Sequence, residues 1–128
     1  VIYHAHTTNT IALTFVLPLD DKVFTRELWE SATECPVVFP DGVGVIGWMV
    51  PGGRDIAVKT AELMKKYDVV IWAHHGMFCS GEDFDLTSDF FIPLKNPQRS
   101  WLRSYPWLRR NCRPSHRMTS VLLQRISK

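Results

Sequence analysis

The chain has 128 residues, of which 45% are hydrophobic, and its formal net charge is +2. This length and composition fit a single soluble globular domain. No apolar run approaches the roughly 20 residues that a membrane-spanning helix needs, so we expect a cytoplasmic protein without a membrane segment. The three cysteines, Cys35, Cys79 and Cys112, are odd in number and widely spaced. This pattern argues against a disulfide framework and predicts free thiols.

Charge is distributed unevenly along the chain. Residues 1–88 hold six Lys or Arg against twelve Asp or Glu, whereas residues 89–128 hold nine against one. A basic segment of this kind is typical of an arm that binds nucleic acid or an anionic membrane. Charge alone therefore leaves nucleic-acid binding open for the C-terminal segment.

The first predicted elements are a strand over residues 1–6 and an apolar helix that ends before Pro18. Thr8 and Asn9 supply the N-cap chemistry for this helix. The two histidines of the strand, His4 and His6, are therefore expected near its C-terminal end.

A second helix is predicted over residues 22–33, because Phe24, Leu28 and Ala32 recur at a spacing of four on one face. The run of apolar residues at 35–39 then predicts a short buried strand. Another apolar stretch at 45–50 lies between two turns that are rich in Pro and Gly.

The next predicted helix runs to about Tyr67, with Ala57, Ala61 and Met64 lining one face. The Val, Ile and Trp residues of 68–73 follow it and predict a central strand that is covered on both sides. Helices that alternate with buried strands are typical of a layered α/β domain.

Three histidines are candidates for one metal site. His4 and His6 project from the same face of a strand, because the side-chain period of a strand is two. Catalytic zinc commonly has three protein ligands and one open position. His75 is the best third ligand, since it ends the second buried strand and precedes Gly76, which allows close backbone approach. The strand period places His74 on the opposite face, in a structural or supporting role. Hydrogen-bonded structural histidines remain the alternative on spacing alone.

Glu34 lies between Thr33 and the predicted strand at 35–39. A carboxylate at the rim of a pocket there would be tuned by burial for proton transfer. The alternative is an ordinary solvated glutamate.

Three segments carry a resemblance to a known family. They are, in chain order, VIYHAHTTNTIALTFVL, FTRELWESATECPVVFPDGVGVIGWMVPGG and VVIWAHHGMFCSG. Their content, order and spacing over residues 1–87 resemble the class II (zinc-dependent) aldolase family. The resemblance implies a three-layer α-β-α sandwich whose N-terminal part is absent, and a parent protein that forms a homotetramer.

The resemblance also implies roles for particular residues. His4, His6 and His75 would bind Zn²⁺, in agreement with the spacing argument, and Glu34 would be an acid/base group that can act across a subunit boundary. The implied reaction cleaves a small phosphorylated sugar, L-rhamnulose 1-phosphate, to dihydroxyacetone phosphate and L-lactaldehyde through a zinc-stabilised enediolate. The alternatives are a member that acts on fuculose phosphate, a ribulose-phosphate 4-epimerase, and a non-catalytic adducin-like binding module.

Two features depart from the family pattern. A further glutamate that acts as a base, and the Gly-rich loops that hold the phosphate, precede the His-x-His pair in the family and are absent here. Residues 88–128 also diverge, and back-translation in a frame shifted by one nucleotide gives an amphipathic helix with Glu-Lys pairs. We therefore expect a partial aldolase domain with a metal site over 1–87 and a basic, out-of-frame tail over 88–128. That origin removes the argument for nucleic-acid binding.

Overall fold

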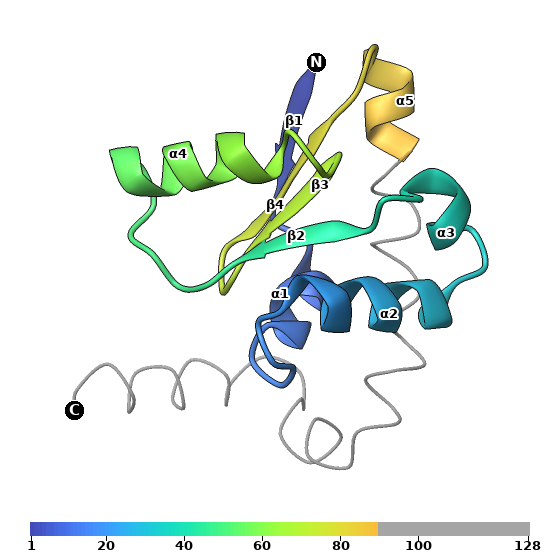
Figure 1. Ribbon diagram of the computed structural model, residues 1–128, viewed down its shortest axis with the longest axis horizontal. Coiled ribbons are helices and arrows are strands. Elements are labelled where there is room, and N and C mark those ends of the chain that lie inside the picture. Colours follow the sequence, from blue (N-terminus) through green and yellow to red (C-terminus); the bar gives the residue numbers. More distant parts are fainter. Residues whose placement is uncertain (90–128) are drawn as a thin grey trace. The chain divides into compact units, whose positions relative to one another are not determined.

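The computed structural model describes residues 1–89, which all belong to one compact unit, Val1–Gln98. The predicted out-of-frame tail over 88–128 lies almost entirely outside the described residues. The described elements, shown in Figure 1, are β1 (Ile2–Ala5), α1 (Thr8–Leu13), α2 (Asp21–Ser31), α3 (Cys35–Val38), β2 (Val43–Ile46), α4 (Arg54–Leu63), β3 (Val69–Trp72), β4 (Gly76–Ser80) and α5 (Phe84–Asp89). No helix within this part of the chain is long and apolar enough to cross a membrane.

The four strands form one mixed sheet in the order β1-β4-β3-β2. β2 runs parallel to β3, while β4 is antiparallel to both β3 and β1. All four residues of β3 are buried, which confirms the predicted central strand. β4 was not predicted, because its five residues follow β3 after a turn of only three residues. Its alternation of buried Met77 and Cys79 with half-buried Phe78 is the pattern that could have revealed it.

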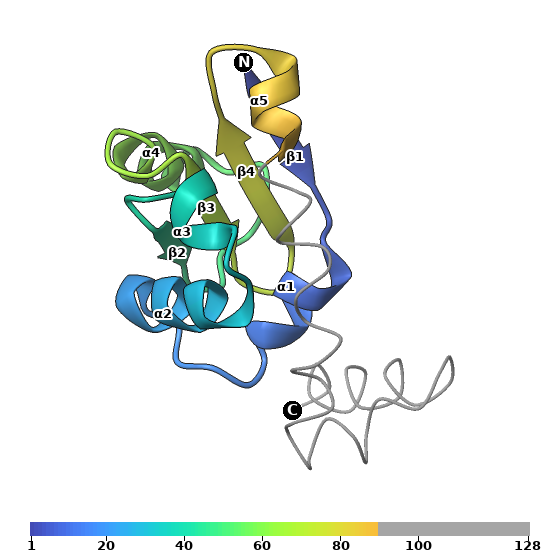
Figure 2. The same cartoon turned by 90° about the vertical axis from the view of Figure 1, so that its right-hand side faces the viewer.

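Helices lie on both sides of the sheet. α4 covers one side and α1 and α2 lie on the other (Figure 1). On the α4 side, Ile56 of the helix packs in a buried cluster with Ile46, Val70 and Trp72 of the sheet. The mixed α/β class is therefore confirmed, with the sheet as the middle layer. Figure 2 shows α5 beside β1, where the rings of Tyr3 and Phe84 meet edge to face at 5.6 Å.

α2 protects the outer edge of β2. The backbone N–H groups of Val43 and Val45 point away from β3 and donate to the side chains of Thr25 and Asp21 of the helix, at 3.0 and 2.7 Å. These backbone N–H groups at the edge of the sheet therefore have side-chain acceptors, where a further strand would otherwise supply carbonyl acceptors. The predicted helix is confirmed, with Phe24 buried as expected.

The strand predicted over 35–39 is wrong, because Cys35–Val38 form the short helix α3. Pro36 lies in its first turn, where the fixed φ of proline suits a helix and its missing N–H costs nothing. Val37 is 80% exposed, so the apolar run does not mark a buried strand.

The helix face predicted from Ala57, Ala61 and Met64 is not the face that packs on the sheet, although Met64 itself is partly buried against the core. Ala57 and Ala61 are exposed, and the helix buries Ile56 and Thr60 instead. Thr60 is tolerated there because its hydroxyl donates to the carbonyl of Ile56 and accepts a hydrogen bond from Trp72 Nε1 at 2.9 Å. A search for apolar residues at helical spacing cannot predict the burial of a polar residue whose hydrogen bonds are made within the core.

The first helix begins at Thr8 and ends at Leu13, with Thr7 at its N-cap position. The predicted N-cap at Thr8 and Asn9 is therefore displaced by one residue. Thr7 makes no side-chain cap hydrogen bond, and the helix lies in contact with β4.

Candidate metal centre

β1 and β4 position the first two histidines. His4 lies in β1 opposite Phe78 of β4, and the two rings stack with their centroids 4.2 Å apart. His6 follows the end of β1 by one residue. Because the two side chains share one face, His4 Nε2 and His6 Nε2 are only 3.0 Å apart.

The third histidine arrives from a different part of the chain. His75 lies in the turn between β3 and β4, and its Nε2 is 3.4 Å from His6 Nε2. The three residues form a group whose ligand nitrogens all lie within 4.8 Å of one another. The structure thus brings together the three histidines that the sequence singled out.

Two of the three nitrogen pairs have a spacing close to that found around a tetrahedral metal ion. Nitrogens bound to zinc at 2.0–2.1 Å in tetrahedral geometry are separated by about 3.3 Å. The separations of 3.0 Å between His4 and His6 and of 3.4 Å between His6 and His75 are close to this value, and all ligand atoms of the group lie within 4.8 Å of one another. His4 and His6 are exposed and His75 is half-buried, so solvent or a substrate can reach the group.

A backbone carbonyl orients the ring of His4. His4 Nδ1 is 2.9 Å from the carbonyl oxygen of Met77, which can only accept a hydrogen bond. The ring proton therefore resides on Nδ1, and the lone pair of Nε2 faces the other two histidines. This is the tautomer that a metal-binding imidazole needs, with its second nitrogen donating to an outer partner.

Burial and, to a lesser extent, the neighbouring His6 and His4 lower the pKa of His75. A lower pKa keeps this imidazole neutral to a lower pH than an isolated histidine. Because only the neutral form binds a metal, the shift favours ligation.

His74 does not belong to the group of three. It lies in the same turn as His75 but has a positive φ of 63°, and its backbone N–H donates to Thr14 Oγ1 at 3.0 Å. The interpretation of His74 as a structural or supporting residue agrees with this placement, although a turn and not a strand positions it.

Glu34 lies away from the histidines. It is exposed at the N-cap position of α3 and makes no side-chain cap hydrogen bond. α3 precedes the start of β2, and β2 is parallel to β3, whereas His75 follows the end of β3. Glu34 is therefore at the opposite end of the sheet. Its charge adds to burial in raising the pKa of its neighbour Cys35 to about 11.

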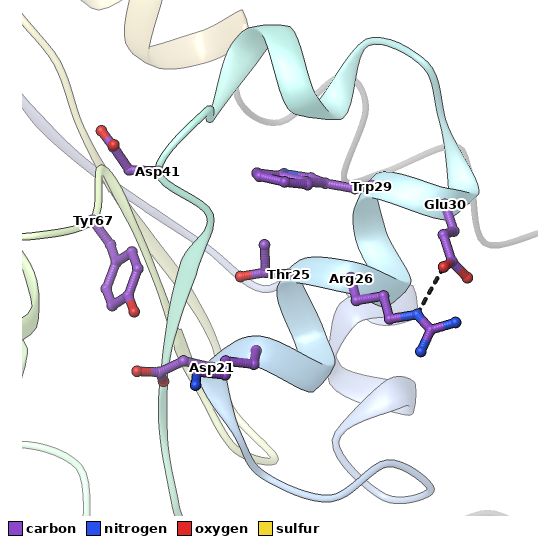
Figure 3. Close-up of a pocket in the computed structure, with 8 residues that line it drawn as sticks. Asp21, Thr25, Arg26, Trp29, Glu30, Asp41 and Tyr67 are labelled. Atoms are coloured by element: carbon purple, nitrogen blue, oxygen red, sulfur yellow. Dashed lines mark hydrogen bonds and ion pairs between the residues drawn. The ribbon is translucent and has the colours of Figure 1, made fainter.

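A pocket of about 440 Å³ lies near α2, also away from the histidines. Trp29 and Tyr67 flank it, and an ion pair of 2.7 Å joins Arg26 and Glu30 at its rim (Figure 3). Its lining residues are Asp21, Lys22, Thr25, Arg26, Trp29, Glu30, Asp41 and Tyr67. Sequence reasoning missed this pocket, because its walls combine one polar helix face with residues that precede two different strands.

Comparison with known proteins now identifies the family. Residues 1–96 match the family described as Class II Aldolase and Adducin N-terminal domain. The chain therefore belongs to the class II aldolase and adducin family, which confirms the resemblance stated above.

Two curated relatives are both called rhamnulose-1-phosphate aldolase. The relative from Escherichia coli O7:K1 is 58% identical over 87 residues, which cover 68% of this chain and 32% of the relative. The relative from Mannheimia succiniciproducens is 59% identical over 85 residues, covering 66% of this chain and 31% of the relative. The chain thus spans about a third of the length of the curated relatives it matches.

Solved structures agree on the fold. A sugar-phosphate aldolase from Thermotoga maritima superposes with a TM-score of 0.68 at 25% identity, covering 80% of this chain and 43% of that one. An L-fuculose 1-phosphate aldolase superposes with a TM-score of 0.54 at 19% identity, covering 80% of this chain and 44% of that one. The predicted α/β fold of the class II aldolase type is confirmed.

Proposed function

We propose that residues 1–87 form the metal-binding part of a class II aldolase. The observation that carries this proposal is the convergence of the Nε2 atoms of His4, His6 and His75, at separations of 3.0 and 3.4 Å between neighbours. These three residues would hold Zn²⁺. When bound, the ion supplies Lewis-acid stabilisation of negative charge that develops on substrate oxygens.

The proposed reaction is the reversible cleavage of L-rhamnulose 1-phosphate to dihydroxyacetone phosphate and L-lactaldehyde. The support is the 58% identity to a protein called rhamnulose-1-phosphate aldolase, which exceeds the 19% identity to an L-fuculose 1-phosphate aldolase. The setting would be rhamnose metabolism in the cytoplasm.

Glu34 is the proposed acid/base group of this reaction. Its carboxylate would take the proton of the hydroxyl group on the carbon that becomes the aldehyde, and would return a proton in the reverse direction. Because Glu34 and His75 lie at opposite ends of one sheet, we propose that the carboxylate that serves a given metal comes from another copy of the chain. This arrangement supports an oligomer, and we propose the homotetramer implied by the family resemblance.

A chimera tests the proposal, because this chain spans only about a third of its curated relatives. Residues 1–87 replace the matching segment of the Escherichia coli relative, and release of dihydroxyacetone phosphate is measured with a coupled assay. The chimera should cleave L-rhamnulose 1-phosphate in preference to L-fuculose 1-phosphate, and should not epimerise L-ribulose 5-phosphate.

Two variants of the chimera separate the roles. His75→Ala should abolish metal binding and cleavage together. Glu34→Gln should keep the metal and lower kcat by about 10²-fold to 10⁴-fold, the usual effect of losing a general acid or base. A folded chimera that retains zinc but cleaves none of these sugars would contradict the proposal and favour a non-catalytic, adducin-like module.

We propose separately that residues 88–128 are translated out of frame. The gene should lack about one nucleotide near the codon of Thr87, as the back-translated helix with Glu-Lys pairs requires. Sequencing across this codon is the test, and a shifted frame that contains many stop codons would contradict the proposal.

A further inference from the structure

The hydroxyl group of Thr14 joins the end of α1 to the turn that carries His75. Thr14 is 3% exposed. Its Oγ1 donates to the carbonyl of Ile11 at 2.6 Å and accepts the backbone N–H of His74 at 3.0 Å. His74 Nδ1 is 3.2 Å from the same oxygen.

These three contacts use the whole hydrogen-bonding capacity of the hydroxyl group. A threonine hydroxyl has one proton and two acceptor lone pairs. Since the proton goes to the Ile11 carbonyl, the ring nitrogen of His74 must donate, so Thr14 accepts from both the backbone and the side chain of one residue. Such a double attachment fixes both the backbone and the ring of His74.

The backbone that Thr14 holds is an unusual one. His74 is the single non-glycine residue within 1–89 with a positive φ, at 63°. Residues other than glycine enter this region rarely and remain there when their surroundings hold them. The ring of Phe15 packs on the ring of His74 with a centroid distance of 4.0 Å, and the N–H of His75 donates to the Trp72 carbonyl at 3.1 Å to close the turn.

The conformation of His74 decides where its neighbour points. His75 is the next residue, and its Nε2 must lie 3.4 Å from His6 Nε2 to complete the group of three. A turn that relaxed toward negative φ at His74 would rotate the following Cα–Cβ bond and move this imidazole away from His4 and His6. The left-handed conformation of His74 is therefore required for His75 to lie beside His4 and His6.

We propose that Thr14 and His74 are positioning residues for the metal site, with Thr14 holding the left-handed turn that aims His75 at the ion. The inference rests on the proposed metal site. Neither residue touches the metal, and both act through His75. Outer partners of metal ligands typically change metal affinity by about 10-fold to 100-fold when they are removed.

The test uses metal binding by the full chain. Zn²⁺ affinity is measured by competition with a chromophoric chelator, and the visible absorption spectrum of the Co²⁺-loaded chain reports the ligand geometry. Thr14→Val, which keeps the shape but removes the hydroxyl group, should weaken Zn²⁺ binding about 10-fold or more and alter the Co²⁺ spectrum. Thr14→Ser should restore both to wild-type values.

Thr25→Val is the matched control. Thr25 Oγ1 accepts the backbone N–H of Val43 at 3.0 Å, as Thr14 Oγ1 accepts that of His74, but it lies at the far end of the sheet. The control variant loses an equivalent hydrogen bond and should keep wild-type metal affinity and spectrum. His74→Gly is a second variant that tolerates the same backbone conformation, so it should fold while binding Zn²⁺ more weakly.

The outcomes are distinguishable. A wild-type chain that binds one Zn²⁺, together with folded Thr14→Val and His74→Gly variants that bind it equally tightly, would overturn this inference and leave the proposed metal site intact. A wild-type chain that binds no Zn²⁺ would overturn both. Equal weakening in Thr14→Val and Thr25→Val would show a general effect of stability and would also overturn the positioning role.

Discussion

Gly76 lies so close to the carbonyl oxygen of Ala5 that a Cβ on Gly76 would be 2.5 Å from that oxygen. The same added atom would be 3.0 Å from His6 Cδ2 and 3.2 Å from His4 Cε1. β4 and β1 therefore approach each other closely at the point where the histidines gather. A glycine is required there by space, because any side chain would meet backbone that cannot move without shifting a strand.

Gly76→Ala should disturb both the fold and the site. Overpacking in a dense region typically costs about 1–3 kcal/mol, and the added methyl group would push His4 and His6 apart from His75. We expect a lower free energy of unfolding by urea in the presence of chelator, and at least a 10-fold loss of Zn²⁺ affinity.

Gly47→Ala is the control for this substitution. A Cβ at Gly47 would meet nothing within 4 Å, so this variant should match the wild type in both measurements. Equal stability and equal Zn²⁺ affinity in the two alanine variants would contradict the steric account of Gly76.

The positive φ of His74 predicts an unusual order of stability among its variants. His74→Gly and His74→Ala both lose the imidazole ring, but only glycine enters the left-handed region without a steric cost. His74→Gly should therefore be the more stable of the two by about 1 kcal/mol, in contrast to ordinary helix or strand positions. Urea unfolding of the metal-free chains measures the difference. An alanine variant as stable as the glycine variant would mean that the turn does not hold the left-handed conformation.

The described cysteines should be unreactive thiols in the folded chain. Cys35 and Cys79 are fully buried, and burial is the main cause that raises the pKa of both, to about 11 for Cys35. In a Cys112→Ser background, which removes the thiol outside the described residues, we expect slow reaction with a disulfide reagent at pH 8 and rapid reaction of two thiols in urea. Rapid reaction without urea would contradict the described burial.

The raised pKa values of Cys35 and Cys79 also predict the direction in which the free energy of unfolding changes with pH. A folded-state pKa above the unfolded value of about 8.5 means that the folded chain holds these protons more tightly. The contribution is fully present below about pH 8.5 and is lost as the pH rises toward 11 for Cys35. The free energy of unfolding should therefore fall over this range, and less steeply in Cys35→Ala.

The elements that could be predicted from sequence are those whose own residues form a recognisable pattern. β3 is a run of β-branched and aromatic residues, and α2 has apolar residues at a spacing of four, so each pattern identifies its own element. α3 and the buried face of α4 could not be predicted in this way. Pro36 starts a helical turn inside an apolar run, and Thr60 is buried because Trp72 binds its hydroxyl group.

The candidate site likewise has features that a local sequence pattern predicts and features that it does not. The shared face of His4 and His6 follows from the period of a strand, and His75 was predicted from its place after a buried strand and before Gly76, in agreement with the family resemblance. The hydrogen bond of His4 to Met77 and the attachment of His74 to Thr14 link residues 73 and 60 positions apart. Contacts of this kind depend on the assembled sheet and have no local pattern. The position of Glu34 at the other end of the sheet could not be predicted either, because it also depends on how the strands are arranged in the assembled sheet.

Metal binding by His4, His6 and His75 is the property on which the proposed function rests. The measurement is titration of the metal-free full chain with Zn²⁺ against a chromophoric chelator, for the wild type and for His4→Ala, His6→Ala and His75→Ala. His116→Ala, at a histidine outside the described residues, is the matched control. We predict one tightly bound Zn²⁺ per chain in the wild type and in the control, and loss of this binding in each of the other three variants. A wild-type chain that binds no Zn²⁺, or a His75→Ala variant that binds it as tightly as the wild type, would contradict the account.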